Sequence, residues 1–393
     1  MSHIAVCVPV GTGHVNPTLG VAAELVARGH RVTYAATEAH AAPIADVGAG
    51  LVSYTTTLTA GSGPPQFTAR DFHRAADAAL VECESVLPQV LSQFRGHEPD
   101  VVLYDATMAW WGRLAAAHWE ARSVACSPNL VGNRHWSMNK YVKVSPVNPG
   151  LLRVLWKAHR LARRHGLTVL NLLQSAGADA HLVFLPRAFQ YAGDTFGPPY
   201  AFVGPCLTPR PSEGSWQPPP GRDVVLIALG TAYHDRTEFF RACLTAFADT
   251  PWHAVLAVGD RVDPTALGPG APNVELHRSV PQLEVLRHAA AFVSHAGMGS
   301  TMEAVAHEVP IVAVPQMTEQ QANADRIAEL RLGVRLSPSA VDPTRLRSAV
   351  RDVISDARVA EALRAMRTDI DAAGGAAAAA DIVDEIACGR PRD

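Results

Sequence analysis

The 393-residue sequence lacks the features that mark membrane, secreted and metal-binding proteins. No apolar run reaches the roughly 18 residues that a membrane-spanning helix needs. The N-terminus has neither the basic start nor the small-residue cleavage site of a secretory signal peptide. The six cysteines are scattered, with no Cys-x-x-Cys pair and no zinc-ligand spacing, so we expect reduced cysteines in the core. These absences predict a cytoplasmic protein with no membrane span and no metal site.

A strong charge of either sign is also missing. Lys and Arg number 34 against 37 Asp and Glu, and the formal net charge is −3. This balance gives no basic field for nucleic acid or anionic lipid, so no nucleic-acid partner is expected. The hydrophobic fraction of 48% is typical of a globular protein, and the length suits two domains.

Short apolar runs alternate with amphipathic segments along the chain, a pattern typical of parallel sheets covered by helices. The pattern breaks once, at a long segment without apolar periodicity, and then restarts. The strands expected before and after this break span residues 4–10, 31–37, 51–54, 101–105, 123–127, 181–185 and 201–203, then 224–230, 253–259, 273–277, 291–297 and 310–316.

The break itself, residues 208–223, is dense in Pro, Gly and Ser and predicts a linker. We therefore expect an N-terminal domain over 1–207 and a C-terminal domain over 224–373. A Gly-Gly pair precedes a last helix over 374–393, expected to pack back toward the N-terminal domain. Each domain should be a doubly wound, Rossmann-like α/β sheet. Ligands should bind beyond the carboxyl ends of the strands, in a cleft between two facing domains.

The stretch GTGHVNP, residues 11–17, joins the first expected strand to a helix. Asn16 is predicted to cap this helix, Pro17 to occupy its first position and Gly29 to end it. A glycine-rich turn at such a place often holds a phosphate, but here His14 stands in its middle. Histidine suits general-base chemistry, because its ordinary pKa of about 6.5 lies near working pH.

Asp105 ends the expected strand 101–105. Since parallel strands end at one edge of a sheet, Asp105 could lie near His14. A carboxylate on one ring nitrogen orients a histidine base and balances its charge after it takes a proton. A histidine in a turn is also often only a local hydrogen-bonding group, and the sequence by itself leaves both interpretations open.

A second glycine-rich turn, within residues 292–310, also follows a strand and opens a helix. Ser300 and Glu303 fit a capping box, with Ser300 as the helix cap. Gly297 and Gly299 would let the backbone approach a ligand closely. Together with His295 and the hydroxyl groups of Ser300 and Thr301, the helix N-terminus would suit a diphosphate.

Two further loops end strands of the second half. Glu319 and Gln320 stand where a loop becomes a helix, and they are interpreted either as helix-start residues or as ligands of sugar hydroxyls. Thr231 follows the first strand of this half and could face the same crevice.

An apolar ligand pocket is predicted in the first half. Aromatic and Met side chains lie in or near long loops after strands, where they could line such a pocket, although core packing explains any one of them about as well. They are Phe67, Trp110, Trp111, Trp136 and Met138. Residues 59–67 are interpreted as a mobile loop over the pocket.

Several motifs, in this order and at these separations, resemble those of the UDP-glycosyltransferases, and the closest resemblance is to the bacterial macrolide-type enzymes. On the donor side they are SVPQLEVL (279–286), HAGMGSTME (295–303) and PQMTEQ (315–320), and on the acceptor side GHVNP (13–17) and YDATMAWW (104–111). The resemblance covers nearly the whole chain. It implies the GT-B fold, with the nucleotide sugar on the C-terminal domain and the acceptor on the N-terminal one.

The resemblance also implies roles for single residues. His295, Ser300 and Thr301 would bind the diphosphate, and Glu303 the ribose, which conflicts with its capping-box role. Ser279 and Gln282 would face the base, and Glu319 and Gln320 the sugar. Ser279 stands where many relatives have a tryptophan that stacks on uracil. Gly299 stands where plant members have a phosphate-binding asparagine.

His14 would be the base, with Asp105 as its partner, in an inverting transfer that needs no metal ion and no cofactor. The expected partners are a nucleotide-sugar donor, preferably UDP-glucose, and an apolar small-molecule acceptor such as a macrolide or flavonoid; the chain would be a monomer or homodimer. A TDP-sugar donor is the alternative. Other hypotheses are an NAD-dependent dehydrogenase, a nucleotide-sugar epimerase and a non-catalytic partner protein that keeps the fold.

Overall fold

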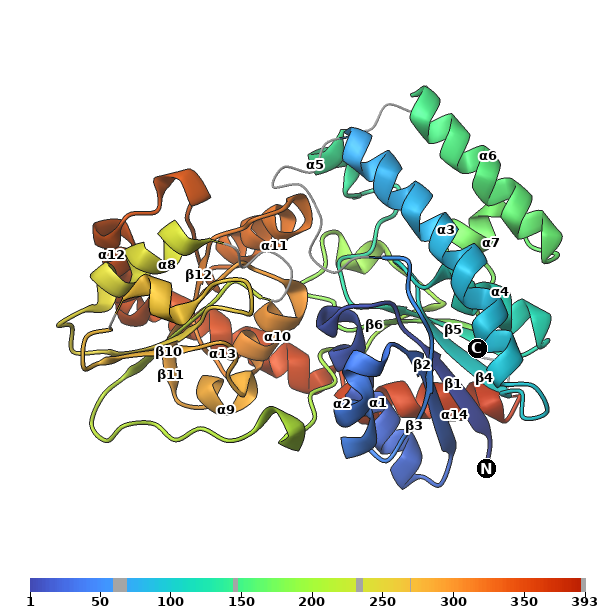
Figure 1. The fold of residues 1–393 in the computed structure, drawn as a ribbon, viewed down its shortest axis with the longest axis horizontal. Coiled ribbons are helices and arrows are strands. Elements are labelled where there is room, and N and C mark those ends of the chain that lie inside the picture. Colours follow the sequence, from blue (N-terminus) through green and yellow to red (C-terminus); the bar gives the residue numbers. More distant parts are fainter. Residues whose placement is uncertain (59–68, 144–147, 231–235, 269, 390–393) are drawn as a thin grey trace. The chain divides into compact units, whose positions relative to one another are not determined.

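A computed structural model describes residues 1–58, 69–143, 148–230, 236–268 and 270–389. The chain forms two compact units, each built on its own parallel sheet (Figure 1). The first unit holds the described residues up to Thr208 and those from Ile370 on, and the second holds those of Pro209–Asp369. In the part of the chain that is described, no helix is long and apolar enough to cross a membrane.

The first unit has a seven-stranded sheet with the order β3-β2-β1-β4-β5-β6-β7, all parallel. The first strand, β1, lies inside the sheet, with β2 and β3 toward one edge and β4 to β7 toward the other. This is the doubly wound arrangement. The strands are β1 His3–Cys7, β2 Arg31–Ala36, β3 Gly50–Ser53, β4 Val101–Asp105, β5 Arg122–Ser127, β6 Ala180–Val183 and β7 Tyr200–Phe202.

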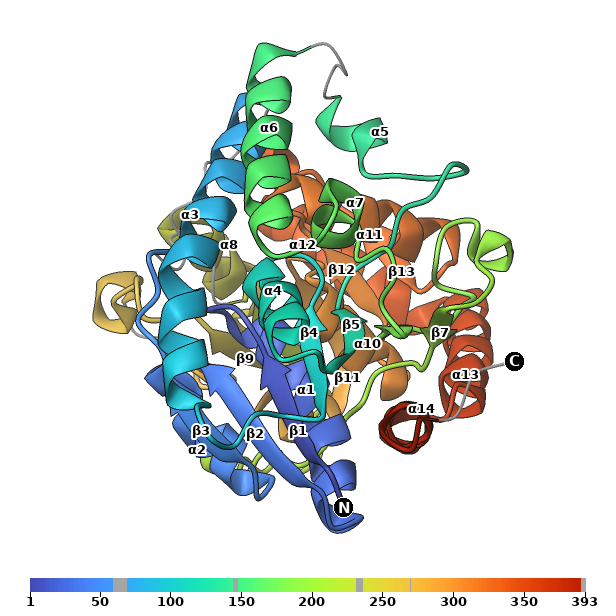
Figure 2. The same ribbon diagram turned by 90° about the vertical axis from the view of Figure 1, so that its right-hand side faces the viewer.

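Helices cover both faces of this sheet (Figure 2). One face carries α1 Thr12–Ala27, α2 Ala41–Asp46 and the C-terminal helix α14 Gly375–Ala387. The other carries α3 Ala69–Gln93, α4 Trp110–His118, α6 Pro149–Arg164 and α7 Val169–Leu173. A short helix, α5, spans Asn139–Val142.

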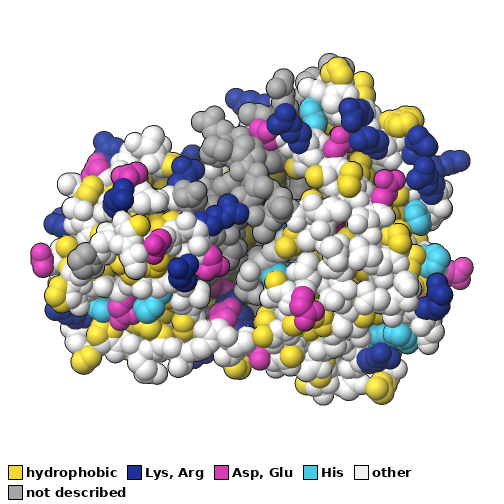
Figure 3. All heavy atoms as spheres, viewed as in Figure 1, with side chains coloured by type: hydrophobic (Ala, Val, Ile, Leu, Met, Phe, Trp, Pro, Cys, Tyr) yellow, Lys and Arg dark blue, Asp and Glu magenta, His cyan; other side chains and the backbone are white. Residues whose placement is uncertain are grey.

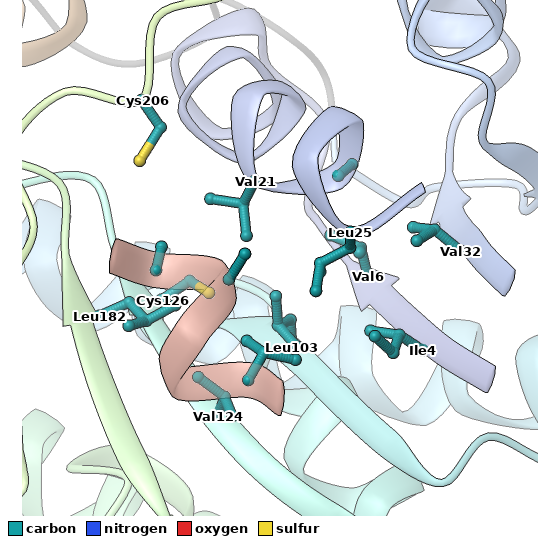
Figure 4. Packing of buried hydrophobic residues seen from close by; sticks show 14 of the residues in the cluster. Ile4, Val6, Val21, Leu25, Val32, Leu103, Val124, Cys126, Leu182 and Cys206 are labelled. Carbon is teal, nitrogen blue, oxygen red and sulfur yellow. The ribbon is translucent and has the colours of Figure 1, made fainter. Parts of the chain in front are cut away.

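The alternation of side chains along each strand separates two cores. Ile4 and Val6 of β1 point to the face of α1 and α14, as Figure 4 shows, whereas Ala5 and Cys7 point to the face of α3 and α4. Strands buried on both faces are nearly continuously apolar, which is why these segments stand out in the sequence.

The C-terminal helix belongs to the first unit. Its side chains Ala379, Ile382 and Val383 join the core under α1. At its edge, Arg28 contacts Asp381 at 2.7 Å and Asp384 at 2.8 Å. Apolar burial therefore holds α14 here, and the partly exposed ion pairs contribute less.

The second unit has a six-stranded parallel sheet with the order β10-β9-β8-β11-β12-β13. Its strands are β8 Val224–Ala228, β9 His253–Ala257, β10 Val274–His277, β11 Ala289–Ser294, β12 Ile311–Ala313 and β13 Gly333–Arg335. Its helices are α8 Thr237–Phe247, α9 Gln282–Leu286, α10 Met298–Ala306, α11 Thr318–Glu329, α12 Pro343–Ser355 and α13 Ala357–Ala372, whose last turn from Ile370 on belongs to the first unit.

All twelve expected strands are confirmed, with ends shifted by a few residues, but β13 was not predicted. It has only three residues and begins with a glycine, so it carries almost no strand signal. The expected reduced cysteines are free, and five of the six are buried, while Cys388 is exposed.

The predicted start of the first helix is wrong. Helix α1 begins at Thr12, directly after Gly11, so Asn16 is not its cap and Pro17 lies inside the helix. Gly11 has φ 138°, which L side chains rarely adopt, and this glycine therefore permits the early start. Gly29, with φ 87°, follows the helix end, as predicted.

Candidate active site

His14 lies in the first turn of α1, beyond the carboxyl end of β1, and not in an extended turn. Strand β1 is hydrogen-bonded to β4, whose last residue is Asp105. The two residues are 91 positions apart in sequence, and their strands end side by side. The sheet order thus brings the histidine and the carboxylate together.

The Nδ1 atom of His14 lies 2.7 Å from the Oδ2 atom of Asp105. An ionised carboxylate only accepts hydrogen bonds, so Nδ1 must donate. In the neutral ring the lone pair is then on Nε2, the atom that can take a proton. The His14 side chain is 19% exposed, whereas Asp105 is 2% exposed, so the carboxylate is held inside and the ring reaches the surface.

Asp105 is fixed by the loop that follows it. Its Oδ1 accepts hydrogen bonds from the backbone N–H of Thr107 at 2.9 Å, from the Thr107 hydroxyl at 2.5 Å and from the N–H of Met108 at 2.8 Å. Burial by itself raises the pKa of Asp105, but His14 and these donors outweigh it, so the pKa lies below its ordinary value. The carboxylate is therefore ionised and orients the ring.

Two aromatic residues, Tyr54 and Trp111, pack together next to the chain that leads to His14, and the sequence did not indicate this contact. The Tyr54 hydroxyl donates to the carbonyl of Val8 at 2.8 Å, next to the loop that leads to His14. The ring centroids of Trp111 and Tyr54 lie 5.2 Å apart in an edge-on arrangement, and Trp111 is completely buried. The prediction that Trp111 lines a ligand pocket is therefore wrong, because it packs in the core between the sheet, α3 and α4.

Three of the remaining predicted pocket residues are only partly accessible. Trp110 is half-buried, and its Nε1 donates to the carbonyl of Ala106 at 3.1 Å. Trp136 stacks on Tyr191 with the ring centroids 4.9 Å apart, so one face of the Trp136 ring is covered by Tyr191. Met138 is half-buried just before α5. Phe67 and the predicted loop 59–67 lie outside the described residues.

A buried carboxylate anchors the segment that precedes this loop. Glu82 of α3 is completely buried and accepts hydrogen bonds from the Thr56 hydroxyl at 2.6 Å and from the Thr57 N–H and hydroxyl at 2.7 and 2.5 Å. Three donors compensate its desolvation. The chain after β3 is thus tied to α3 at Thr56 and Thr57.

In the second unit, the loop after β11 leads into α10. The helix begins at Met298 with Gly297 as its cap, so the predicted capping box with Ser300 as cap is wrong, and Ser300 lies in the first turn. The N–H groups of the first turn have no acceptor within the helix. They therefore form, with the helix dipole, a site that favours an anion.

The ring of His295 lies between two glycines. A Cβ on Gly230 would come within 2.6 Å of its Cε1 and Nε2 atoms, and one on Gly297 within 2.3 Å of Nε2. Burial lowers the pKa of His295 to about 4, against a smaller raising effect from the backbone of Ala228. The ring is therefore neutral at working pH.

The loop between His295 and α10 is strained. Ala296 has φ 61°, a left-handed conformation that is costly for a residue with a side chain. It is held because Asn323 of α11 donates to the Ala296 carbonyl at 2.9 Å and the Ser294 hydroxyl accepts from the Ala296 N–H at 3.2 Å. Asn323 therefore positions the glycine-rich loop, and no sequence motif pointed to this role.

Gln282 and Glu303 lie together with an arginine that no sequence motif marks. The Nε2 of Gln282 donates to Glu303 Oε2 at 2.5 Å and to Ser300 Oγ at 3.2 Å. Arg210 donates to the other oxygen of Glu303 at 2.9 Å, and the two side chains are only 7% and 9% exposed. Since Arg210 stands in the predicted linker, 72 positions before Gln282 and 93 before Glu303, only its unusual burial identifies it.

The other predicted donor-side residues differ in accessibility. Ser279 is exposed just after β10. Glu319 is half-buried and accepts from Asn323 at 2.9 Å, whereas Gln320 is 3% exposed and its Oε1 accepts from the Gln316 N–H at 2.8 Å. Thr301 is completely buried inside α10, and its hydroxyl oxygen is not accessible from the surface. Thr231 lies outside the described residues.

Within the described ranges, no group of three or more His, Cys, Asp or Glu side chains could hold a metal ion. The polar groups gathered at the start of α10 are backbone N–H groups, a hydroxyl, an amide and a neutral imidazole. Such donors suit a phosphate, which needs hydrogen-bond donors and no metal ligand.

Comparison with known proteins gives a consistent family. Residues 248–386 match the family model for the C-terminal domain of erythromycin biosynthesis protein CIII-like proteins. Demethyllactenocin mycarosyltransferase of Streptomyces fradiae is 38% identical, covering 98% of this chain and 86% of that protein. Oleandomycin glycosyltransferase of Streptomyces antibioticus is 34% identical, covering 98% of this chain and 90% of that protein.

A solved structure agrees with these relatives. The calicheamicin glycosyltransferase CalG4 superimposes with a TM-score of 0.83 at 36% identity, covering 99% of this chain and 98% of that one. With similarity of this degree over nearly its whole length, the chain belongs to the macrolide-type glycosyltransferases of the UDP-glycosyltransferase superfamily, enzymes of GT-B fold that transfer a sugar.

Proposed function

We propose that this glycosyltransferase moves a hexose to a hydroxyl group of an apolar small molecule, with His14 as general base and inversion at the anomeric carbon. The observation that carries this proposal is the 2.7 Å contact between His14 Nδ1 and the buried carboxylate of Asp105. Family membership displaces the dehydrogenase and epimerase hypotheses, and the alternative is a non-catalytic protein that keeps the fold.

The base acts through the ring atom opposite Asp105. His14 Nε2 takes the proton of the acceptor hydroxyl as its oxygen attacks the anomeric carbon. The ring becomes an imidazolium, and the ionised Asp105 stabilises it across the existing hydrogen bond. Because Asp105 is held by Thr107 and Met108, the ring has its orientation before the acceptor binds.

The leaving group is a nucleoside diphosphate. We assign its phosphates to the first turn of α10, where the N–H groups near Gly299, the Ser300 hydroxyl and neutral His295 offer donors. Stabilising the negative charge of the leaving diphosphate in this way needs no metal ion. Glu303 would accept hydrogen bonds from the ribose, and Glu319 from the sugar.

The donor and the acceptor are proposed more narrowly than the family requires. UDP-glucose is the preferred donor, because Glu319 offers a carboxylate to free sugar hydroxyls; a TDP-sugar is the alternative. Relatives named for oleandomycin and calicheamicin support a macrolide or another polyketide acceptor. The cytoplasmic location and the monomeric or dimeric state remain predictions.

A donor panel tests the proposal. The full chain would be incubated with UDP-glucose or with TDP-sugars and either a macrolide or a flavonoid, and products would be identified by mass and by the anomeric coupling constant. A product of inverted configuration is expected, and His14→Ala should abolish it. Hydrolysis of the donor alone, or no product with any donor, would contradict the proposal, and transfer by folded His14→Ala above a few per cent would refute the base.

A further inference from the structure

One segment of the first unit has a charge very different from that of the whole chain. Residues 121–178 contain no Asp and no Glu, although the whole chain has a net charge of −3. The same segment carries nine basic residues, which are Arg122, Arg134, Lys140, Lys143, Arg153, Lys157, Arg160, Arg163 and Arg164. Although the net charge of the whole chain is close to zero, this segment is therefore strongly basic.

Most of this charge lies on α6, where Lys and Arg side chains gather along one edge of the first unit (Figure 3). The inner face of α6 is buried through Val154, Ala158 and Leu161. Its outer face carries Leu152 and Trp156, which are 54% and 57% exposed. Leu152, Trp156, Arg160 and Arg163 follow one another at spacings of three or four residues, so they share one side of the helix.

Exposed apolar side chains are concentrated on the same helical layer. Seven large apolar side chains are exposed in the described residues, and five of them lie on α3, α6 and α7. They are Val81, Leu152, Leu155, Trp156 and Leu170. Helices α3 and α7 both pack against α6, so this is one region and not a scatter of single residues.

The acidic residues of α3 neutralise only one edge of α6. Asp77 pairs with Lys157 at 3.0 Å and with Arg153 at 3.6 Å, and Glu84 pairs with Arg164 at 3.5 Å. Arg160 and Arg163 form no ion pair within the described part of the chain, and the Arg160 guanidinium lies 4.7 Å from the Trp156 ring centre. The outward side is therefore both cationic and apolar.

We propose that the outer face of α6 docks on an anionic phospholipid surface. A basic helix with Leu and Trp on its exposed side is suited to the lipid interface, where the apolar groups enter the headgroup layer and the arginines meet phosphates. Nucleic acid would use the arginines but not the leucines. A second copy of the chain would bring the same positive charge against itself. The competing occupant is an acidic protein.

Vesicle flotation tests the docking surface without using the transferase reaction. The full chain is mixed with vesicles of phosphatidylcholine alone or of phosphatidylcholine with phosphatidylglycerol. We expect flotation with the anionic vesicles only, and release by salt, because screening weakens the attraction. Equal flotation with both compositions, or none at low salt, would overturn the proposal.

Charge reversal locates the surface. The variant R160E/R163E should reduce binding to anionic vesicles roughly 10- to 100-fold, since each basic residue near such a surface contributes about a factor of five. The control R351E/R364E makes the same charge change on exposed sites of α12 and α13 and should bind as the parent does. Equal loss in both variants would show a general charge effect and refute the site.

A third variant separates lipid from protein. L152A/W156A leaves the charge unchanged and should also weaken vesicle binding, since the apolar groups no longer enter the lipid. Binding of the parent to a polyglutamate peptide but not to anionic vesicles would assign the surface to an acidic protein instead. Circular dichroism confirms that each variant is folded.

Discussion

The guanidinium of Arg210 lies 2.9 Å from Glu303 Oε1, and both side chains are buried. Arg210 comes from the segment before β8 and Glu303 from α10, so the pair ties the start of the second unit to its candidate ribose site. Gln282 occupies the other carboxylate oxygen at 2.5 Å. Glu303 is therefore held in one orientation from two sides.

Replacing Arg210 with Ala should destabilise the second unit by roughly 3 kcal/mol, because it leaves a buried carboxylate without its cation. The KM for the donor should rise roughly tenfold with a smaller change in kcat, since Arg210 positions a binding residue. Arg210→Lys should recover part of the lost stability and part of the lost donor affinity. Chemical denaturation and steady-state kinetics measure these effects.

The matched control is Arg241→Ala, which removes an exposed pair with Glu238 on α8. Exposed pairs contribute little, so this variant should behave as the parent does. If Arg210→Ala is as mild as this control, the buried pair does not position Glu303.

Replacing Asp105 with Asn should keep the loop and still remove the base. The amide oxygen can accept the hydrogen bonds of Thr107 and Met108, but the amide NH₂ would face His14 Nδ1 and donate to it. The ring proton then moves to Nε2, where it blocks proton transfer. We expect kcat to fall roughly 10²- to 10⁴-fold with unchanged circular dichroism.

Thr107→Val provides the comparison, because it removes one hydroxyl donor to Asp105 and leaves both backbone donors. Its loss of kcat should stay within about tenfold. Equal losses in Asp105→Asn and Thr107→Val would mean that loop geometry, and not the tautomer of His14, limits the rate.

The stability of the fold should depend on pH through His295. Its pKa in the folded protein is about 4, below the ordinary 6.5, so the unfolded chain binds a proton that the folded one rejects. The stabilisation is complete above pH 6.5 and falls as the pH drops toward 4, by up to roughly 3 kcal/mol. Urea unfolding of the parent and of His295→Asn across this range measures the difference.

His295→Asn should reduce the pH dependence between pH 6.5 and 4, whatever its effect at pH 7. Part of the dependence should remain, because burial also lowers the pKa of His40 and of His181. His288→Asn changes an exposed histidine of the same unit and should leave the slope unchanged. Parallel curves for the parent and His295→Asn would contradict a neutral ring with a lowered pKa.

The two glycines at the start of α10 should respond differently to substitution. A Cβ on Gly299 meets no atom within 4 Å, whereas one on Gly297 comes within 2.3 Å of His295 Nε2. Gly299→Asn should therefore change stability by less than about 0.5 kcal/mol and strengthen UDP binding, because it adds a donor near the phosphates. Gly297→Ala should weaken UDP binding roughly tenfold by displacing the ring.

Isothermal titration with UDP compares the two variants on the same footing. If Gly297→Ala binds UDP as the parent does, the ring of His295 takes no part in the phosphate site. Weaker binding by a folded Gly299→Asn would place the phosphates elsewhere than at the first turn of α10.

Much of the site could be predicted because its residues stand at the ends of strongly apolar strands. The strands β1 and β4 are recognisable by themselves, and a parallel sheet places their carboxyl ends, with His14 and Asp105, at one edge. The helix starts were predicted less well. Gly11, with φ 138°, lets α1 begin earlier than Asn16 suggested. Helix α10 likewise begins right after Gly297 and not at Ser300.

The sequence by itself determined the two sheets, the glycine-rich anion site and the candidate base, because these depend on local periodicity and on residue chemistry at strand ends. Only the tertiary structure decided that Trp111 supports the core, that Asn323 holds the strained Ala296 and that Arg210 pairs with Glu303. These contacts join residues up to 93 positions apart. Their energy comes from burial, which no local pattern in the chain reveals.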